Sequence, residues 1–247
     1  MATVAIQGLA PFLPGHRPRS PARWWTASAP AGLPPRARTV SIEALEEGPD
    51  PPEVSGVAGL AAPCSLPEPF LASLALPPER AAQLRALASR TANRLLREAR
   101  SFAARRTRGQ RHPRRGPGES ASALDRARLP LFHAALPLLA RHRTCPWDAA
   151  EPPFLVEVDP PSLLAALGLP SSSLGGERAD AIERRAAALE ALARSGPGFR
   201  VVVGPRDLAI ASEPALRAVV AAAAAAWFVR NRPSPPPPPA SCWIPLP

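Results

Sequence analysis

The chain has 247 residues, a formal net charge of +10 and a hydrophobic fraction of 46%, enough to bury a core, which excludes a wholly disordered protein. Its three cysteines, Cys64, Cys145 and Cys242, include no Cys-x-x-Cys pair, which argues against a disulfide framework or a cysteine zinc site. The apolar run 219–229 is too short to span a bilayer. No basic residue precedes the first apolar run, which argues against a signal peptide. We therefore expect a cytoplasmic protein without membrane segments.

The amino-acid usage has a bias that GC-rich codon usage explains. Every basic residue is arginine, tyrosine is absent and proline occurs 36 times, which is typical of GC-rich bacterial-type codon usage. Codon bias does not explain the excess of positive charge, because aspartate and glutamate were equally available. The charge favours a polyanionic partner such as nucleic acid.

The first 60 residues have the pattern of a strand-rich opening. Short β-prone runs at Thr3–Leu9, Arg23–Ala27 and Arg38–Ile42 are separated by Pro/Gly segments, which predicts an antiparallel meander. Glu43–Glu47 is interpreted as one helical turn, and Val54–Leu60 as a further strand. This order predicts the start of a mixed α/β sheet.

The middle of the chain changes to a helical period. From Pro78 to about Arg108, apolar residues recur at three-, four- and seven-residue steps, while arginines occupy most other positions. We predict one long helix there, followed by a flexible basic insert at about 108–120. A second helix is expected over Ala123–Arg143, where Pro130 and Pro137 should kink or split it.

The last 100 residues alternate strand and helix signals. The expected elements are a strand Phe154–Val158, a helix ending at Gly168, an amphipathic helix through Ile182, Ala186, Leu189 and Ala193, an edge strand at Phe199–Gly204, and a last helix with Ser212 as N-cap and Pro214 in its first turn. We therefore predict one α/β domain over residues 1–230. The Pro-rich tail, 231–247, is expected to be disordered.

Four local patterns in this order resemble a known family. They are Ile6-Gln7-Gly8 at the end of a strand, a Gly59–Pro67 turn, Val156–Pro160 followed by Leu-Gly, and a helix with Leu216–Ala222. Together they resemble an uncharacterised bacterial and archaeal family of predicted ribonuclease H-like nucleases, over roughly residues 3–230. The resemblance implies a ribonuclease H-like mixed sheet flanked by helices.

The resemblance also implies where catalytic carboxylates would stand. That chemistry needs several carboxylates around one or two divalent cations. Here Gln7, Ala61 and Arg217 occupy three of the four family positions, and only Glu157 keeps its carboxylate. We therefore predict a catalytically degenerate protein without a metal cofactor, in which Arg217 pairs with Glu157 in place of the metal charge.

An active nuclease is the alternative to this prediction. Asp159, Asp207 and Glu213 lie near the degenerate positions in sequence and are candidates for displaced ligands of Mg²⁺ or Mn²⁺.

A basic stretch supplies the candidate nucleic-acid interface. Arg90 to Arg115 contains ten arginines and a single acid, Glu98, which favours salt-sensitive, sequence-independent phosphate binding. A solvated helix face in an arginine-biased chain is the alternative interpretation. The candidate contacts are Arg90, Arg94, Arg97, Arg105, Arg106 and Arg108. A third hypothesis is a protein-interaction adaptor that uses the proline run 235–239.

Overall fold

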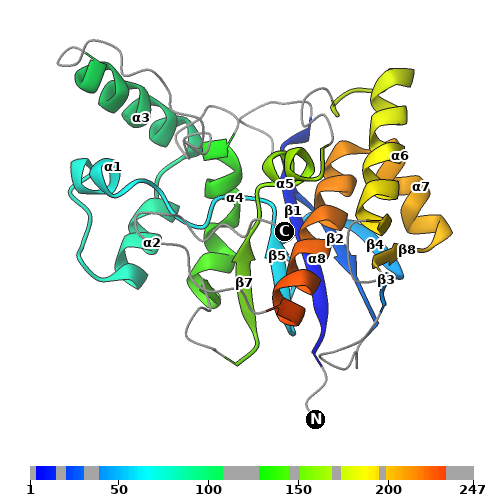
Figure 1. The fold of residues 1–247 in the computed structure, drawn as a ribbon. Helices are drawn as coiled ribbons and strands as arrows, with labels where there is room; N and C mark the ends of the chain where they lie inside the picture. The colour runs from blue at the N-terminus through cyan, green and yellow to red at the C-terminus, as the bar shows by residue number, and fades with distance from the viewer. Residues whose placement is uncertain are drawn as a thin grey trace.

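The computed structural model describes residues 4–14, 21–30, 39–107, 128–144, 151–168, 174–194 and 199–231. In these residues a six-stranded mixed sheet forms the centre of the molecule, with helices on both of its faces (Figure 1). The predicted mixed α/β class is confirmed at this level. A second, two-stranded sheet lies beside it.

The strands are short and mostly apolar. They are β1 (Ile6–Phe12), β2 (Arg23–Ser28), β3 (Val40–Ile42), β4 (Ala44–Gly48), β5 (Val57–Leu60), β6 (Arg143–Thr144), β7 (Phe154–Glu157) and β8 (Phe199–Val201).

The helices differ widely in length. They are α1 (Glu68–Ser73), α2 (Arg80–Ala88), α3 (Ala92–Thr107), α4 (Arg128–Arg141), α5 (Pro160–Ala166), α6 (Ala179–Arg194), α7 (Val203–Ala211) and α8 (Glu213–Asn231).

The order of the large sheet is β4-β2-β1-β5-β7-β6. Strands β4, β2 and β1 form an antiparallel meander, while β5, β7 and β6 continue the sheet in parallel. Parallel neighbours need crossover connections, and helices α1 to α4 fill the long connection from β5 towards β7. The carboxyl ends of β5 and β7 therefore lie side by side, with Leu60 opposite Glu157.

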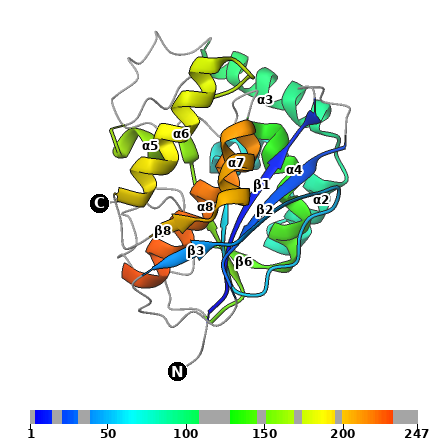
Figure 2. The same ribbon diagram turned by 90° about the vertical axis from the view of Figure 1, so that its right-hand side faces the viewer.

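Alternation along the strands divides the core into two layers. On β7, Val156 belongs to the layer under α8, whereas Leu155 belongs to the layer under α2, α3 and α4. The same division puts Gly59 and Ala61 on the α8 side and Leu60 on the other. Figures 1 and 2 show the two helical groups on opposite faces of the sheet.

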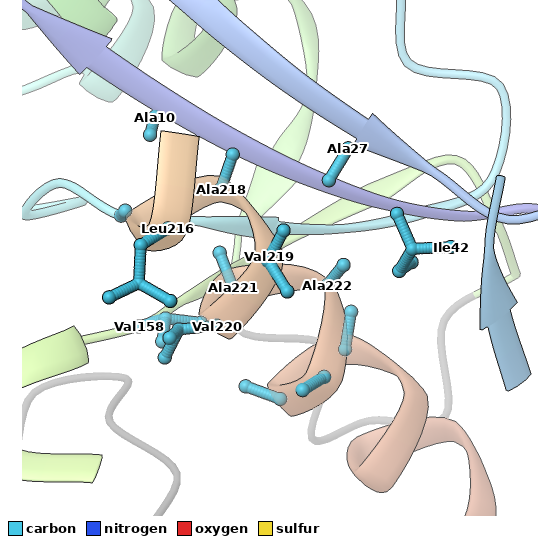
Figure 3. Close-up of a cluster of buried hydrophobic side chains, with 14 of the residues drawn as sticks. Ala10, Ala27, Ile42, Val158, Leu216, Ala218, Val219, Val220, Ala221 and Ala222 are labelled. Atoms are coloured by element: carbon cyan, nitrogen blue, oxygen red, sulfur yellow. The ribbon is translucent and has the colours of Figure 1, made fainter. Parts of the chain in front are cut away.

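Helix α8 approaches the sheet very closely because both surfaces are built from small residues. A Cβ atom at Gly8 would lie 1.9 Å from the Ala218 carbonyl oxygen, and one at Gly59 would lie 1.9 Å from the Ala221 oxygen. Figure 3 shows the alanines of α8 directed at β1 and its neighbours. Ala218, Ala221 and Ala222 thus lie on the side of α8 that contacts the sheet.

The prediction of a helical turn at Glu43–Glu47 is wrong. The segment forms β4 and pairs antiparallel with β2, with Trp25 opposite Glu47. Alanine, leucine and glutamate favour helix, but pairing with β2 buries Leu45 and leaves Glu46 exposed, and this tertiary gain exceeds the weak local propensity. As a result β4 is the third strand of the meander, while β3 pairs with β8 in the small sheet.

The expected long helix from Pro78 to Arg108 is two helices. Helix α2 ends at Ala88 and α3 starts at Ala92, with the Thr91 hydroxyl accepting a hydrogen bond from the Arg94 N–H at 3.2 Å. The expected edge strand at Phe199–Gly204 is shorter in the structure: β8 ends at Val201, and Val203 begins α7. The β-branched Val202-Val203 pair does not indicate this helix.

Some predictions fall outside the described residues. These are the flexible insert at 108–120, the Pro-rich tail from 232 onward, and the surroundings of Cys145 and Cys242. Among the helices that the structure does describe, none combines the length and apolar character needed to cross a membrane.

Candidate functional site

Glu157 is the last residue of β7, at the carboxyl end of the parallel strands. Its side chain points to the α4 side of the sheet, because Val156 and Val158 alternate with it and face α8. The carboxylate is buried, and its Oε2 accepts a hydrogen bond from the Cys64 N–H at 3.0 Å. The loop that follows β5 therefore supplies its first partner.

Asp159 and Arg128 complete a small charged cluster at this position. The Arg128 guanidinium lies 3.7 Å from Asp159 Oδ1, and the Ser162 hydroxyl donates to Asp159 Oδ2 at 2.5 Å. The side chains of Arg128 and Asp159 are only 14% and 11% exposed, so this ion pair is shielded from water. We call Glu157, Asp159, Arg128 and Cys64 the Glu157 cluster.

Electrostatics in the cluster oppose ionisation of Glu157. Burial raises the pKa of this carboxyl above its ordinary value, and the negative charge of Asp159 adds to the rise. The Cys64 N–H and the Arg128 charge act in the opposite direction without cancelling it. The pKa of Glu157 is thus raised overall, and Arg128 and the Cys64 N–H limit that rise.

Cys64 has the environment of an unreactive thiol. Burial raises its pKa well above the ordinary value, and the nearby charge of Glu157 raises it further, against a smaller opposing effect of Arg80. The thiolate is the nucleophilic form of cysteine, so this environment suppresses reactivity. Cys64 is thus a free, buried thiol.

The structure does not gather the four family positions into one site. Gln7 lies near the start of β1, where its amide donates to the Glu53 oxygen at 3.1 Å and accepts from the Ser55 N–H at 3.2 Å. These partners precede β5, whereas Glu157 lies opposite Leu60, the last residue of β5. Ala61 packs in the layer under α8, on the opposite face from Glu157.

The predicted pairing of Arg217 with Glu157 is wrong. Arg217 lies on α8, and its Nε is 3.4 Å from Glu213 Oε1, one helical turn earlier. The register of β7 directs Glu157 away from α8, so the two side chains belong to opposite sides of the sheet. Arg128, which the sequence did not single out, is the cation whose charge acts on Glu157.

The proposed displaced metal ligands do not form a suitable donor set. Asp159 is beside Glu157, but Asp207 is exposed on α7 and Glu213 is paired on α8. The Arg128 guanidinium already pairs with Asp159, and its charge also acts on Glu157. In the described ranges, no group of three or more His, Cys, Asp or Glu side chains could hold a metal ion. The residues therefore do not fit a two-metal centre.

Helix α3 presents the arginines of the basic stretch in two different ways. Arg90, just before the helix, is mostly buried: it donates to Glu98 at 2.7 Å and to the Leu74 oxygen at 3.2 Å. Its guanidinium is thus held by contacts within the fold. Arg94 also contacts Glu98, at 3.1 Å, but its side chain stays 59% exposed.

Three further arginines of α3 face solvent. Arg97, Arg100 and Arg105 are exposed, whereas Leu95 and Ala99 are buried and Phe102 packs edge-on against Phe70 with ring centres 5.5 Å apart. Of the other predicted contacts, Arg106 belongs to α3 by its backbone, and Arg108 lies outside the described residues. We call Arg94, Arg97, Arg100 and Arg105 the α3 arginine face.

Comparisons with known proteins give no relative for this chain. No family model matches it, and neither a curated protein nor a solved structure gives a match. The resemblance to ribonuclease H-like nucleases therefore stays a prediction from local patterns.

Proposed function

We propose that this chain is a catalytically degenerate ribonuclease H-like protein that binds nucleic acid without sequence specificity through the α3 arginine face. The order of elements supports the fold part of the proposal. An antiparallel meander of β1, β2 and β4 is followed by parallel strands β5 and β7, joined through helices. This is the element order on which the family resemblance rests.

The Glu157 cluster supports the loss of catalysis. Metal-dependent hydrolysis of a phosphodiester needs carboxylates that are free to bind a divalent cation. Asp159 is instead paired with Arg128, and Glu157 accepts a backbone hydrogen bond and has its pKa raised by burial. A fixed guanidinium supplies positive charge at this position but cannot activate a water molecule as a metal does.

The observation that carries the binding proposal is the arrangement of α3. Its apolar side is committed to the core, while three exposed arginines, Arg97, Arg100 and Arg105, extend over about 12 Å at the helical rise of 1.5 Å per residue. An arginine row of this kind can contact successive phosphates, and it reads charge rather than base sequence. Figure 1 shows α3 at the outer edge of its helical group, away from α8.

The binding test compares two variants with equal charge change. One replaces Arg97, Arg100 and Arg105 by glutamine, and the control replaces Arg178, Arg194 and Arg200, which are also exposed but lie outside α3. Fluorescence anisotropy with labelled DNA and RNA of random sequence should show weakened binding only in the α3 variant. Equal weakening in both variants would mean that net charge, and not α3, drives binding.

The cleavage test separates the proposal from the active-nuclease alternative. The full chain is incubated with Mn²⁺ or Mg²⁺ and labelled single- and double-stranded substrates, beside Glu157→Gln. We expect no cleavage above background by either protein. Cleavage by the natural chain that Glu157→Gln abolishes would overturn the proposed loss of catalysis. The adaptor hypothesis concerns the Pro-rich tail, which lies outside the described residues.

A further inference from the structure

A groove lies where the junction of α2 and α3 meets the first turns of α4. The chain at Leu13, after β1, and at Ala22, before β2, lines its other side. Its volume is about 510 Å³. Pockets that hold a small organic molecule have volumes of roughly 300–1,000 Å³, so the groove has room for such a group.

The walls of the groove expose apolar surface. Ala88, at the end of α2, is exposed, and the side chains of Leu13, Ala22 and Ala134 are only half-buried. They come from different segments of the chain, so the apolar surface is distributed around the groove. A ligand can therefore cover apolar surface that is in contact with water when the groove is empty.

Polar side chains stand among these apolar ones. Ser89, Thr91 and Asn93 are exposed and line the groove, and each can donate and accept hydrogen bonds. The Thr91 hydroxyl oxygen accepts from the Arg94 N–H, which leaves the hydroxyl hydrogen to donate to a ligand. The groove thus offers several hydrogen-bonding groups beside its apolar walls.

The imidazole of His133 is held in the groove by a hydrogen bond to the backbone. Its Nε2 donates to the Arg90 carbonyl oxygen at 2.6 Å, because a carbonyl oxygen can only accept. In a neutral imidazole with this tautomer, Nδ1 is an acceptor. The ring therefore offers one acceptor and a flat face of the kind on which a planar group can stack.

The charges around the groove favour a neutral ligand group. Among the described residues no Asp or Glu lines it, and the one lining arginine, Arg90, has its guanidinium bound to Glu98 and to the Leu74 oxygen. A phosphate inside the groove would therefore have to compete with Glu98 for Arg90. A neutral planar group with an apolar face and hydrogen-bonding edges matches the lining better.

The groove leads into the α3 arginine face. Asn93 lines the groove, and Arg97 and Arg100 follow it at steps of four and three residues, so the three lie along one side of α3. At 1.5 Å per residue, Asn93 and Arg100 are about 10 Å apart along the helix. In Figure 1, α3 extends outward from its end beside α4. A strand whose phosphates contact Arg97 and Arg100 thus passes next to the groove.

We propose, on the basis of the function proposed above, that the groove binds one unpaired base of a single-stranded nucleic acid whose backbone lies on the α3 arginine face. The base lies against the apolar walls and the His133 ring, and its edge bonds to Asn93 and Thr91. Single strands are commonly bound in this way, by cations along the backbone and by surfaces that receive splayed bases. A paired base would first have to leave its duplex.

The test compares two labelled strands with equal numbers of phosphates, an oligothymidine and an abasic strand of the same length. In fluorescence anisotropy the full natural chain should bind the oligothymidine at least about fivefold more tightly, because a base contact of this kind contributes at least that factor. Equal binding of the two strands would overturn the base groove and leave the proposed function standing. Absence of binding to both strands would overturn the proposed function and the base groove together.

Variants then locate the base contact. Ala134→Phe fills the groove and should abolish the preference for oligothymidine over the abasic strand. Asn93→Ala, at an exposed position that does not contribute to the core, should reduce that preference about threefold through the loss of a hydrogen bond. The control is Ala187→Phe, on the exposed side of α6, which should keep the full preference. A preference that survives both groove variants, or that Ala187→Phe also removes, would overturn the proposal.

Discussion

At the scale of single residues, the molecule keeps a carboxylate on an apolar strand, and among the described residues no metal donor set surrounds it. Glu157 is 5% exposed, accepts one backbone hydrogen bond and shares Arg128 with Asp159. A buried carboxylate without a partner costs several kcal/mol or takes up a proton. At Glu157 the Arg128 charge and the Cys64 N–H reduce that cost, and the pKa of the carboxyl is nevertheless raised. The ionisation of Glu157 should therefore affect how the free energy of unfolding changes with pH.

Glu157→Gln should remove a pH-dependent loss of stability. Burial raises the pKa of Glu157 in the folded chain, so the folded state binds the proton more tightly than the unfolded state. The resulting stabilisation is complete below the pKa of the unfolded chain, about 4.3, and disappears as the pH rises through the folded pKa. The natural chain should therefore lose stability relative to Glu157→Gln as the pH rises.

Urea unfolding of both proteins from acid to neutral pH measures this difference. Glu190→Gln, on the exposed face of α6, is the control and should show no such trend. If the natural chain gained stability relative to Glu157→Gln with rising pH, Glu157 would be better solvated or better paired than we infer.

Arg128→Met should be far more damaging than Arg217→Met. Removing Arg128 leaves two buried carboxylates without their cation, which we expect to cost about 3–5 kcal/mol at neutral pH. Arg217 pairs only with the partly exposed Glu213, so its loss should cost about 1 kcal/mol or less. Chemical denaturation at pH 7 compares the two. A similar cost for both would place Arg128 outside the electrostatics of Glu157.

At the scale of elements, the contact of α8 with the sheet is the feature most sensitive to added volume. Gly8→Ala and Gly59→Ala would each push a methyl group against backbone oxygens of α8 at 1.9 Å. Backbone on both sides leaves no rotamer to adjust, so we expect a loss of about 3 kcal/mol or more in each variant.

Gly204→Ala is the matched control for this contact. A Cβ at Gly204, in α7, would meet nothing within 4 Å, and alanine favours a helix, so stability should rise by up to about 1 kcal/mol. Thermal unfolding distinguishes the three variants. Tolerance of alanine at Gly8 and Gly59 would mean that α8 lies farther from the sheet than described.

The sequence predicts a helix or strand well where the spacing of apolar residues within the segment itself specifies it. The apolar runs that form β1, β5 and β7 and the helical period of α6 are visible without tertiary information. The predicted apolar face of α6 is wrong at three positions: Ile182 and Ala193 are exposed, and the side chain that is fully buried instead is that of Arg185. Its four carbonyl acceptors come together only in the folded chain, so no local pattern could reveal them.

The candidate site was only partly predictable for the same reason. The apolar neighbours of Glu157 in 154–158 predict that its carboxylate is buried, and the side chain is buried. Arg128 is distant in sequence and begins an apolar helix, so nothing in the chain marks it as the partner of Glu157. Likewise, the choice between Arg217 and Arg128 depends on which face of β7 carries Glu157, and a one-residue change of register would have reversed it.

At the scale of the whole molecule, the sheet separates three features. The Glu157 cluster lies on the side of α4, the ion pair of Glu213 and Arg217 lies on α8, and the α3 arginine face lies at the outside of the first helical group. We expect variants in one feature to leave the others unchanged, because distant sites are usually additive. Arg217→Gln should therefore not alter nucleic-acid binding.

The salt dependence of nucleic-acid binding tests the central claim most directly. Each arginine that contacts a phosphate contributes roughly 0.9 to the slope of log Kd against log salt for duplex DNA. The natural chain should bind with a steep slope, and replacing Arg97, Arg100 and Arg105 by glutamine should lower that slope by up to about 3, whereas the control triple at Arg178, Arg194 and Arg200 should leave it unchanged. An unchanged slope in the α3 variant, or no binding by the natural chain at low salt, would contradict the account.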